Sequence, residues 1–133
     1  MYHGRMDEQS TRQACEFDIF APQCPSRRAF DHIFSRWGIL VLARLTGNPM
    51  RFGELRRAIG GISEKMLSQT LKVLEREGLL DRQEWDEKPP RVEYSLTASG
   101  ERISESIGSV IRNLYRELAE NYRERGAAAG KAS

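Results

Sequence analysis

Residues 60–80, GGISEKMLSQTLKVLEREGLL, restrict the fold of this chain more than any other segment. Two glycines break the chain there, because glycine adopts positive φ at little cost. Ser63 is placed to cap a helix that we expect to end near Glu77, and Gly78 fits its C-terminal cap. One narrow apolar seam runs along this helix. It consists of Leu67, Leu71 and Leu74. We therefore expect the helix to pack along the seam and to present its other face outward.

The outward face carries long or hydrogen-bonding side chains and few carboxylates. Its candidate DNA-binding residues are Ser63, Lys65, Met66, Ser68, Gln69 and Lys72. Glutamine can pair with adenine, lysine can donate to guanine, and methionine can touch a thymine methyl group. Ser63, at the positive end of the helix, suits a phosphate. A merely solvated face is the alternative, but such faces are usually richer in glutamate. The composition favours insertion into the major groove of DNA.

Apolar residues at helical spacing predict further helices before this one. The expected ranges are 29–37, 39–45 and 52–59. Pro25 stands just before the first range, where Ser26 is a candidate cap, and Gly38 is a candidate joint between the first two helices. The segment TGNPM is rich in glycine, asparagine and proline, and it predicts a turn between the second and third ranges.

A β-hairpin and a long helix follow. Alternation in LLDRQEW and RVEYSL predicts two short strands around the tip DEKPP. Helices joined by a tight turn and followed by a hairpin describe a winged helix-turn-helix, so the expected class is mainly α with a small β-hairpin (α+β). The expected units are residues 1–21 as an N-terminal extension, 22–96 as the DNA-binding domain, 97–125 as a C-terminal dimerisation helix and 126–133 as a flexible tail.

Basic residues outside the central helix offer contacts to the DNA backbone. Arg51, Arg56 and Arg57 lie on or just before the helix of residues 52–59, where phosphate contacts are expected. In the hairpin, Arg91 is favoured over the tip, because Asp86 and the neighbouring glutamate would repel a phosphate. A structural hairpin with scattered surface charge is the alternative for this wing.

An apolar stripe follows the long C-terminal helix at spacings of three and four residues. It consists of Ile103, Ile107, Val110, Ile111, Leu114 and Leu118. The stripe could fold back on its own domain, or it could pair with a second copy, since a small winged helix offers limited surface to cover it. We expect a homodimer, with contributions from Phe30 and Phe34, whose recognition helices lie about 34 Å apart. An inverted-repeat operator follows from that symmetry.

Cys15 and Cys24 are the only cysteines, and their spacing with the two histidines matches no zinc pattern. Both would be free thiols in a reducing cytosol. Cys24 stands at an expected helix N-terminus, which lowers a thiol pKa, so we treat it as a candidate redox sensor. A semi-buried structural cysteine is the alternative. Trp37 and Trp85 are expected in core packing rather than in a pocket for a small-molecule effector.

Four blocks of sequence resemble the HxlR-type winged helix-turn-helix transcriptional regulators. They are CP at 24–25, RWGILVLARL from Arg36, RFGELRRAIGGISEKMLSQTLKVLEREGLL from Arg51 and PPRVEYSLTASG from Pro89. The resemblance spans roughly residues 24–118. It implies a homodimeric bacterial or archaeal DNA-binding regulator, often a repressor, and in some members the cysteine of the CP block senses oxidants or electrophiles.

Composition and motifs exclude several classes of protein. Apolar residues make up 39% of the 133-residue chain, and no run approaches the roughly 20 apolar residues of a membrane span. The first residues lack the layout of a signal peptide, so we expect a cytoplasmic protein. There is no phosphate loop, acid–base pair or metal cluster, so we expect neither an enzyme nor a cofactor. A winged helix that contacts only proteins remains the alternative to a regulator that binds double-stranded DNA.

Overall fold

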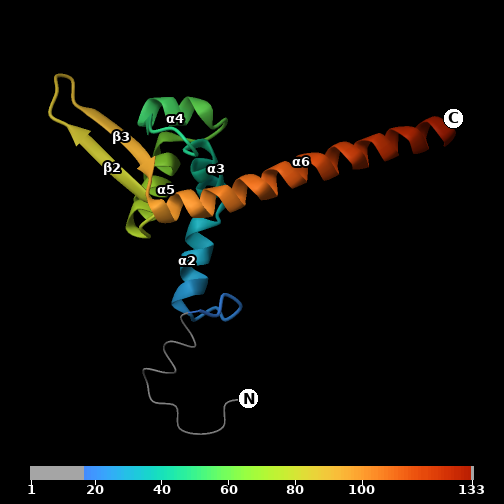
Figure 1. Cartoon of the computed structure of the whole chain (residues 1–133), viewed down its shortest axis with the longest axis horizontal. Helices are drawn as coiled ribbons and strands as arrows, with labels where there is room; N and C mark the ends of the chain where they lie inside the picture. The colour runs from blue at the N-terminus through green and yellow to red at the C-terminus, as the bar shows by residue number, and fades with distance from the viewer. Residues whose placement is uncertain (1–16, 133) are drawn as a thin grey trace, which may run out of the picture.

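Within residues 17–132, which this computed structural model describes, four helices precede the hairpin. They are α2 (Pro25–Ile33), α3 (Arg36–Arg44), α4 (Phe52–Ala58) and α5 (Glu64–Arg76). Figure 1 shows α3, α4 and α5 gathered together, with α2 extending from them toward the N-terminus. The expected winged helix-turn-helix is confirmed, because a hairpin and a long helix follow α5.

A three-stranded antiparallel sheet forms the wing. It contains β1 (Met50–Arg51), β2 (Leu80–Trp85) and β3 (Arg91–Leu96) in the order β1-β3-β2. Leu80 lies opposite Leu96, and Trp85 lies opposite Arg91, so the predicted hairpin is confirmed. The sequence did not predict β1, because a strand of two residues is too short to show an alternating pattern.

The core forms where α3, α5 and the base of the wing meet. Leu67, Leu71 and Leu74 are all buried there, as their spacing predicted, and α5 packs against α3. Thr70 is buried beside them, and its hydroxyl donates to the carbonyl oxygen of Met66 at 2.7 Å. Ser63 caps α5 by accepting from the Met66 amide at 3.1 Å, which confirms the predicted start of this helix.

The joint between α2 and α3 differs from the sequence expectation. Cys24 is the N-cap of α2 and Pro25 is its first residue, so Ser26 does not cap the helix. The break lies at Phe34 and Ser35 rather than at Gly38. Gly38 belongs to the first turn of α3, where its amide donates to Ser35 Oγ at 3.1 Å. It must be glycine because a Cβ atom there would overlap the carbonyl oxygen of Ile33.

Helix α6 (Ala98–Ala132) is longer than expected. Its predicted end was Arg125, but the helix continues through the alanine-rich segment that follows, because alanine has the highest helix propensity and the glycines there cost only about 1 kcal/mol each. Thr97 fixes its start: the Thr97 hydroxyl donates to the Gly78 carbonyl at 2.7 Å and accepts from the Gly100 amide at 3.0 Å. Figure 1 shows α6 projecting far beyond the helical core, on the side away from the wing.

Candidate nucleic-acid interface

Five of the six residues predicted for DNA binding on α5 are exposed to solvent, and one of the five is the cap, Ser63. The other four are Lys65, Met66, Gln69 and Lys72. Met66, for example, keeps 38% of its surface exposed although the leucines of the same helix are buried. Ser63 is exposed too, while Ser68 is half-buried. A helix anchored along one side, with amide, ammonium and thioether groups on the other, can present these groups to base edges in a major groove.

Helix α4 contributes the neighbouring basic residues. Arg51 is its N-cap, the Arg51 amide donates to Glu54 Oε1 at 3.1 Å, and the residue is exposed to solvent. Arg57 is exposed and has no ion pair among residues 17–132. Arg51 and Arg57 line one shallow surface depression with Gly53 and Glu54. These two arginines are therefore the freest candidates for phosphate contacts on α4.

Arg56 is already paired. Its Nη1 atom donates to Glu64 Oε1 at 3.1 Å and links α4 to the first residue of α5. Sequence reasoning missed Glu64, although a carboxylate directly after the Ser63 cap is a usual partner of a helix N-terminus. The glutamate side chain is 71% exposed, so the pair faces solvent and adds little stability. It places a negative group beside the predicted DNA-binding face.

The wing holds its arginines close to carboxylates. The Arg91 guanidinium lies over the Trp85 ring, 4.0 Å from the centroid, and stands 3.7 Å from Glu87 and 3.7 Å from Glu93. Arg82 donates to Glu84 at 3.1 Å, and its pKa is raised by hydrogen bonds to Tyr94 and then Glu84. Arg91, the predicted wing contact, is thus stacked and charge-compensated, which weakens its case as a phosphate ligand.

The apolar stripe of α6 divides into two parts. Ile107 is buried in the core of its own domain, and Ile103 and Ile111 pack partly against that core. The other members remain in solvent: Val110 is 65% exposed, Leu114 50% and Leu118 37%. The predicted interface residues on α2 are exposed as well, and the Phe30 and Phe34 rings lie 5.0 Å apart. Only the outer part of the stripe is therefore available to a second copy.

Cys24 occupies the N-cap of α2 and is only 2% exposed. It is disulfide-bonded in the structure, so the free thiol expected for a reducing cytosol is not what is seen. Cys15 lies outside the described residues. Nearby, Arg27 Nε bonds Asp31 at 3.3 Å and Nη1 bonds the Ile19 carbonyl at 3.3 Å, which holds the segment before α2 against the helix.

The described residues contain neither a metal site nor a membrane-spanning helix. Within them, no group of three histidine, cysteine or acidic side chains could hold a metal ion. Nor does any helix there have the length and apolar character needed to cross a membrane. Trp37 packs partly against the core, as expected, and Arg36 lies 4.5 Å above its ring.

Known proteins are similar to this chain in sequence and in fold. The HxlR-like helix-turn-helix family matches residues 32–125. The HTH-type transcriptional regulator YtfH of Escherichia coli strain K12 is 49% identical over 100 residues, which cover 75% of this chain and 79% of YtfH. Among solved structures, a transcriptional regulator ytfH from Salmonella typhimurium is 44% identical with a TM-score of 0.73, and the match covers 81% of this chain and 96% of that one.

A further solved structure is described as the redox regulator HypR in its oxidized form. It is 30% identical, with a TM-score of 0.61, and the match covers 74% of this chain and 96% of HypR. These relatives are helix-turn-helix regulators rather than enzymes. The similarity to these proteins agrees with the buried seam of α5, its basic outer face and the wing. The chain therefore belongs to the HxlR-like helix-turn-helix family of transcriptional regulators, which are DNA-binding proteins.

Proposed function

We propose that the chain binds an inverted-repeat operator as a homodimer, with one α5 helix in the major groove of each half-site, and that it represses transcription. The outward face of α5 carries this proposal. Gln69 has the amide needed to read adenine, and Lys65 and Lys72 can donate to guanine or to phosphates. Repression is the sign of regulation that the family resemblance implies.

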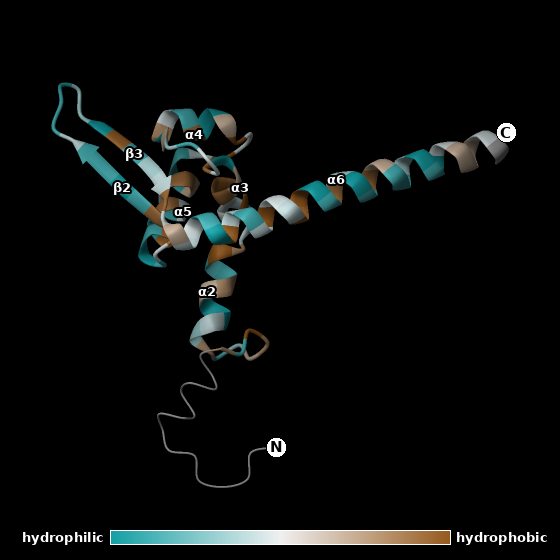
Figure 2. Ribbon diagram, in the orientation of Figure 1, coloured by the Kyte–Doolittle hydropathy of each residue, from teal (hydrophilic) through white to brown (hydrophobic). Residues whose placement is uncertain are grey.

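Exposed apolar side chains support the dimer. Val110, Leu114 and Leu118 lie on α6 with large exposed fractions, and Phe30 and Phe34 are exposed on α2. Figure 2 shows apolar residues recurring along the part of α6 that leaves the domain. Covering them with the same residues of a second copy would remove this surface from water and relate the two α5 helices by a two-fold axis.

The first experiment is a selection of random duplex DNA by the reduced protein at about 150 mM salt. Enrichment of an inverted repeat with half-sites one helical turn apart is expected. With about three phosphate contacts per subunit, binding of that site should follow a log–log salt slope near −5. If no sequence is enriched and the protein binds DNA no better than a Lys65→Ala/Gln69→Ala variant does, a winged helix that contacts only proteins becomes the better description.

Leu114→Glu tests the dimer separately. A carboxylate in the outer stripe should give a monomer in sedimentation and should abolish binding of the full inverted repeat at concentrations where the wild type saturates it. Glu105→Gln, at an exposed position on the opposite side of the same helix from Leu114, is the matched control. A Leu114→Glu variant that sediments as a dimer would contradict the proposed interface.

We further propose that Cys24 senses oxidants. Its position at the N-cap of α2, its disulfide in the structure and the likeness to HypR support this role. An oxidant such as diamide takes two electrons and two protons from a pair of thiols and leaves a disulfide. Operator binding by the reduced wild type should therefore change on diamide treatment, whereas that of Cys24→Ser should not. Equal sensitivity of the two proteins would exclude Cys24 as the sensor.

A further inference from the structure

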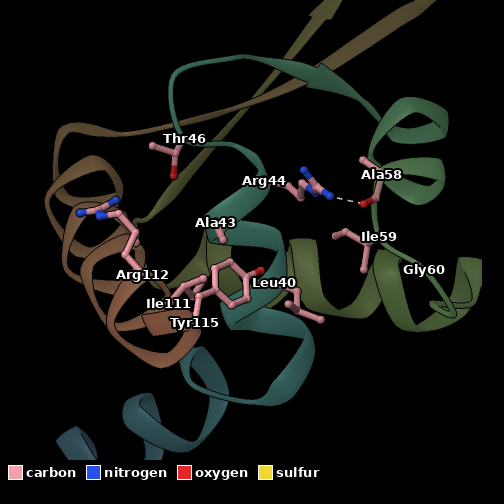
Figure 3. Close-up of a pocket in the computed structure, with 11 residues that line it drawn as sticks. Leu40, Ala43, Arg44, Thr46, Ala58, Ile59, Gly60, Ile111, Arg112 and Tyr115 are labelled. Atoms are coloured by element: carbon pink, nitrogen blue, oxygen red, sulfur yellow. Dashed lines mark hydrogen bonds between the residues drawn. The ribbon is translucent and has the colours of Figure 1, made fainter. Parts of the chain in front are cut away.

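A hollow of about 460 Å³ lies between the winged helix and the base of α6. Figure 3 shows α3 along it, the end of α4 on one side and α6 on the other. Its apolar lining consists of Leu40, Ala43, Ile59 and Ile111. Its polar lining consists of Arg44, Thr46, Arg112 and Tyr115. The volume falls in the usual range for small-molecule sites, which are apolar with a few well-placed polar groups.

The charge of this hollow is positive. Arg44 and Arg112 both line it, and among the described residues that do so none has a carboxylate. Arg112 forms no ion pair within residues 17–132, and its guanidinium lies against Gly108, where a Cβ atom would be only 3.2 Å from Nη1. The Arg44 Nε–H donates to the Ala58 carbonyl oxygen at 3.0 Å, so the two terminal nitrogens of the guanidinium can donate to another acceptor.

The hollow and the exposed stripe lie on different faces of α6. At about 100° per residue, Tyr115 points roughly 100° away from Leu114, and Arg112 points to the opposite side from Val110. A second copy that covers Val110 and Leu114 therefore leaves the side of α6 with Arg112 and Tyr115 open to a small molecule.

We infer that this hollow binds a small organic acid with an apolar or aromatic body. The carboxylate would pair with a guanidinium, which matches its planar two-oxygen geometry. The body would lie on Leu40, Ile59 and Ile111, beside the Tyr115 ring. An inorganic anion would leave the apolar lining unused, and a neutral hydrocarbon would leave the Arg112 guanidinium and the terminal nitrogens of Arg44 without an acidic partner.

Binding here would reach the recognition helix through Arg44. Arg44 donates to the carbonyl of Ala58, the last residue of α4. Ile59 and Gly60, which also line the hollow, begin the turn of residues 59–63 that connects α4 to α5. A ligand between Arg44, Ile59 and α6 would therefore change the position of the turn before α5. This coupling rests on the proposed DNA-binding function, whereas ligand binding itself does not.

Benzoate is the probe, and its binding is measured by calorimetry and by chemical-shift changes on the full chain without DNA. For a ligand of this size we expect a dissociation constant on the order of 1 mM. Benzamide, with the same ring and no charge, and inorganic phosphate, with charge and no ring, should each bind at least tenfold more weakly. Arg44→Gln/Arg112→Gln should weaken benzoate binding at least tenfold. Arg116→Gln, an exposed arginine on the next turn of α6, should leave it unchanged.

Three results would overturn the inference: no saturable benzoate binding, equal binding of phosphate, or unchanged binding by the double variant. Circular dichroism of the double variant must match the wild type, and single Arg112→Gln provides the same test if the Arg44 substitution disturbs the fold. Operator affinity is then measured with and without saturating benzoate. A protein that binds benzoate but no operator would refute the proposed function while leaving the acid site intact.

Discussion

Gly38→Ala should destabilise the protein although alanine is the better helix former. Inside a helix this exchange normally gains about 0.5–1 kcal/mol. Here the added methyl group would overlap the Ile33 carbonyl oxygen and lie 3.1 Å from Ser35 Oγ. Both neighbours belong to the tight joint between α2 and α3, so the overlap can be relieved only by moving backbone. Overpacking of this kind costs about 1–3 kcal/mol, which outweighs the helix gain.

The expected net loss is therefore on the order of 1–2 kcal/mol in the free energy of unfolding. Urea unfolding followed by circular dichroism measures it, at one fixed protein concentration because a dimer would make stability depend on concentration. Gly53→Ala is the matched control: its methyl group would meet only the flexible end of Arg57, at 3.4 Å, so its stability should be unchanged or slightly higher. A Gly38→Ala protein as stable as Gly53→Ala would refute the overlap argument.

Further substitutions test the core and the two kinds of DNA contact. Leu74→Ala, at a side chain with no exposed surface, should cost about 2–5 kcal/mol of unfolding free energy in the same assay, and a loss below about 1 kcal/mol would mean that the seam is not packed as described. Gln69→Ala should weaken operator binding by about 1–3 kcal/mol per half-site and relax selectivity at one base position, with the salt slope unchanged; a uniform loss on all sequences would indicate a phosphate contact instead. Glu64→Gln should release Arg56 and remove a carboxylate from the DNA-binding face, so affinity should rise and the salt slope of a dimer should steepen by about 2; an unchanged slope would mean that Arg56 stays off the DNA.

The strongest sequence patterns predicted the recognition helix and the hairpin correctly. Leu67, Leu71 and Leu74 repeat at helical spacing between Ser63 and Gly78, and the structure buries all three leucines and uses the serine as the cap. These features depend on residues close together in the chain, so local physical chemistry determines them.

Contacts between distant segments could not be predicted in this way. The pairing of Arg56 with Glu64 needs the angle between two helices, and the stacking of Arg91 on Trp85 needs the register of the hairpin. Gly38 suggested a break, but its actual reason is the close approach of the preceding helix. The hollow beside α6 could not be predicted for the same reason, because α3, the end of α4 and α6 contribute to it together.

Helix α3 packs against both α5, which we propose to bind DNA, and α6, which we propose to form the dimer. It therefore connects the DNA-binding helix to the dimer interface. The start of α6 is also fixed to the end of α5, through the Thr97 hydroxyl on the Gly78 carbonyl and through Gly100, where a Cβ atom would overlap the Leu79 carbonyl oxygen. Because the winged helix is tied at these points, we expect it to move as one body with the base of α6. In the proposed dimer, the angle at which two α6 helices meet would therefore set the spacing of the two recognition helices. The disulfide-bonded Cys24 caps α2, the helix that also carries Phe30, and the hollow lies on another face of α6 than Val110 and Leu114. An oxidant or an acid could thus alter operator binding by changing the angle between whole domains, with no refolding of the winged helix itself.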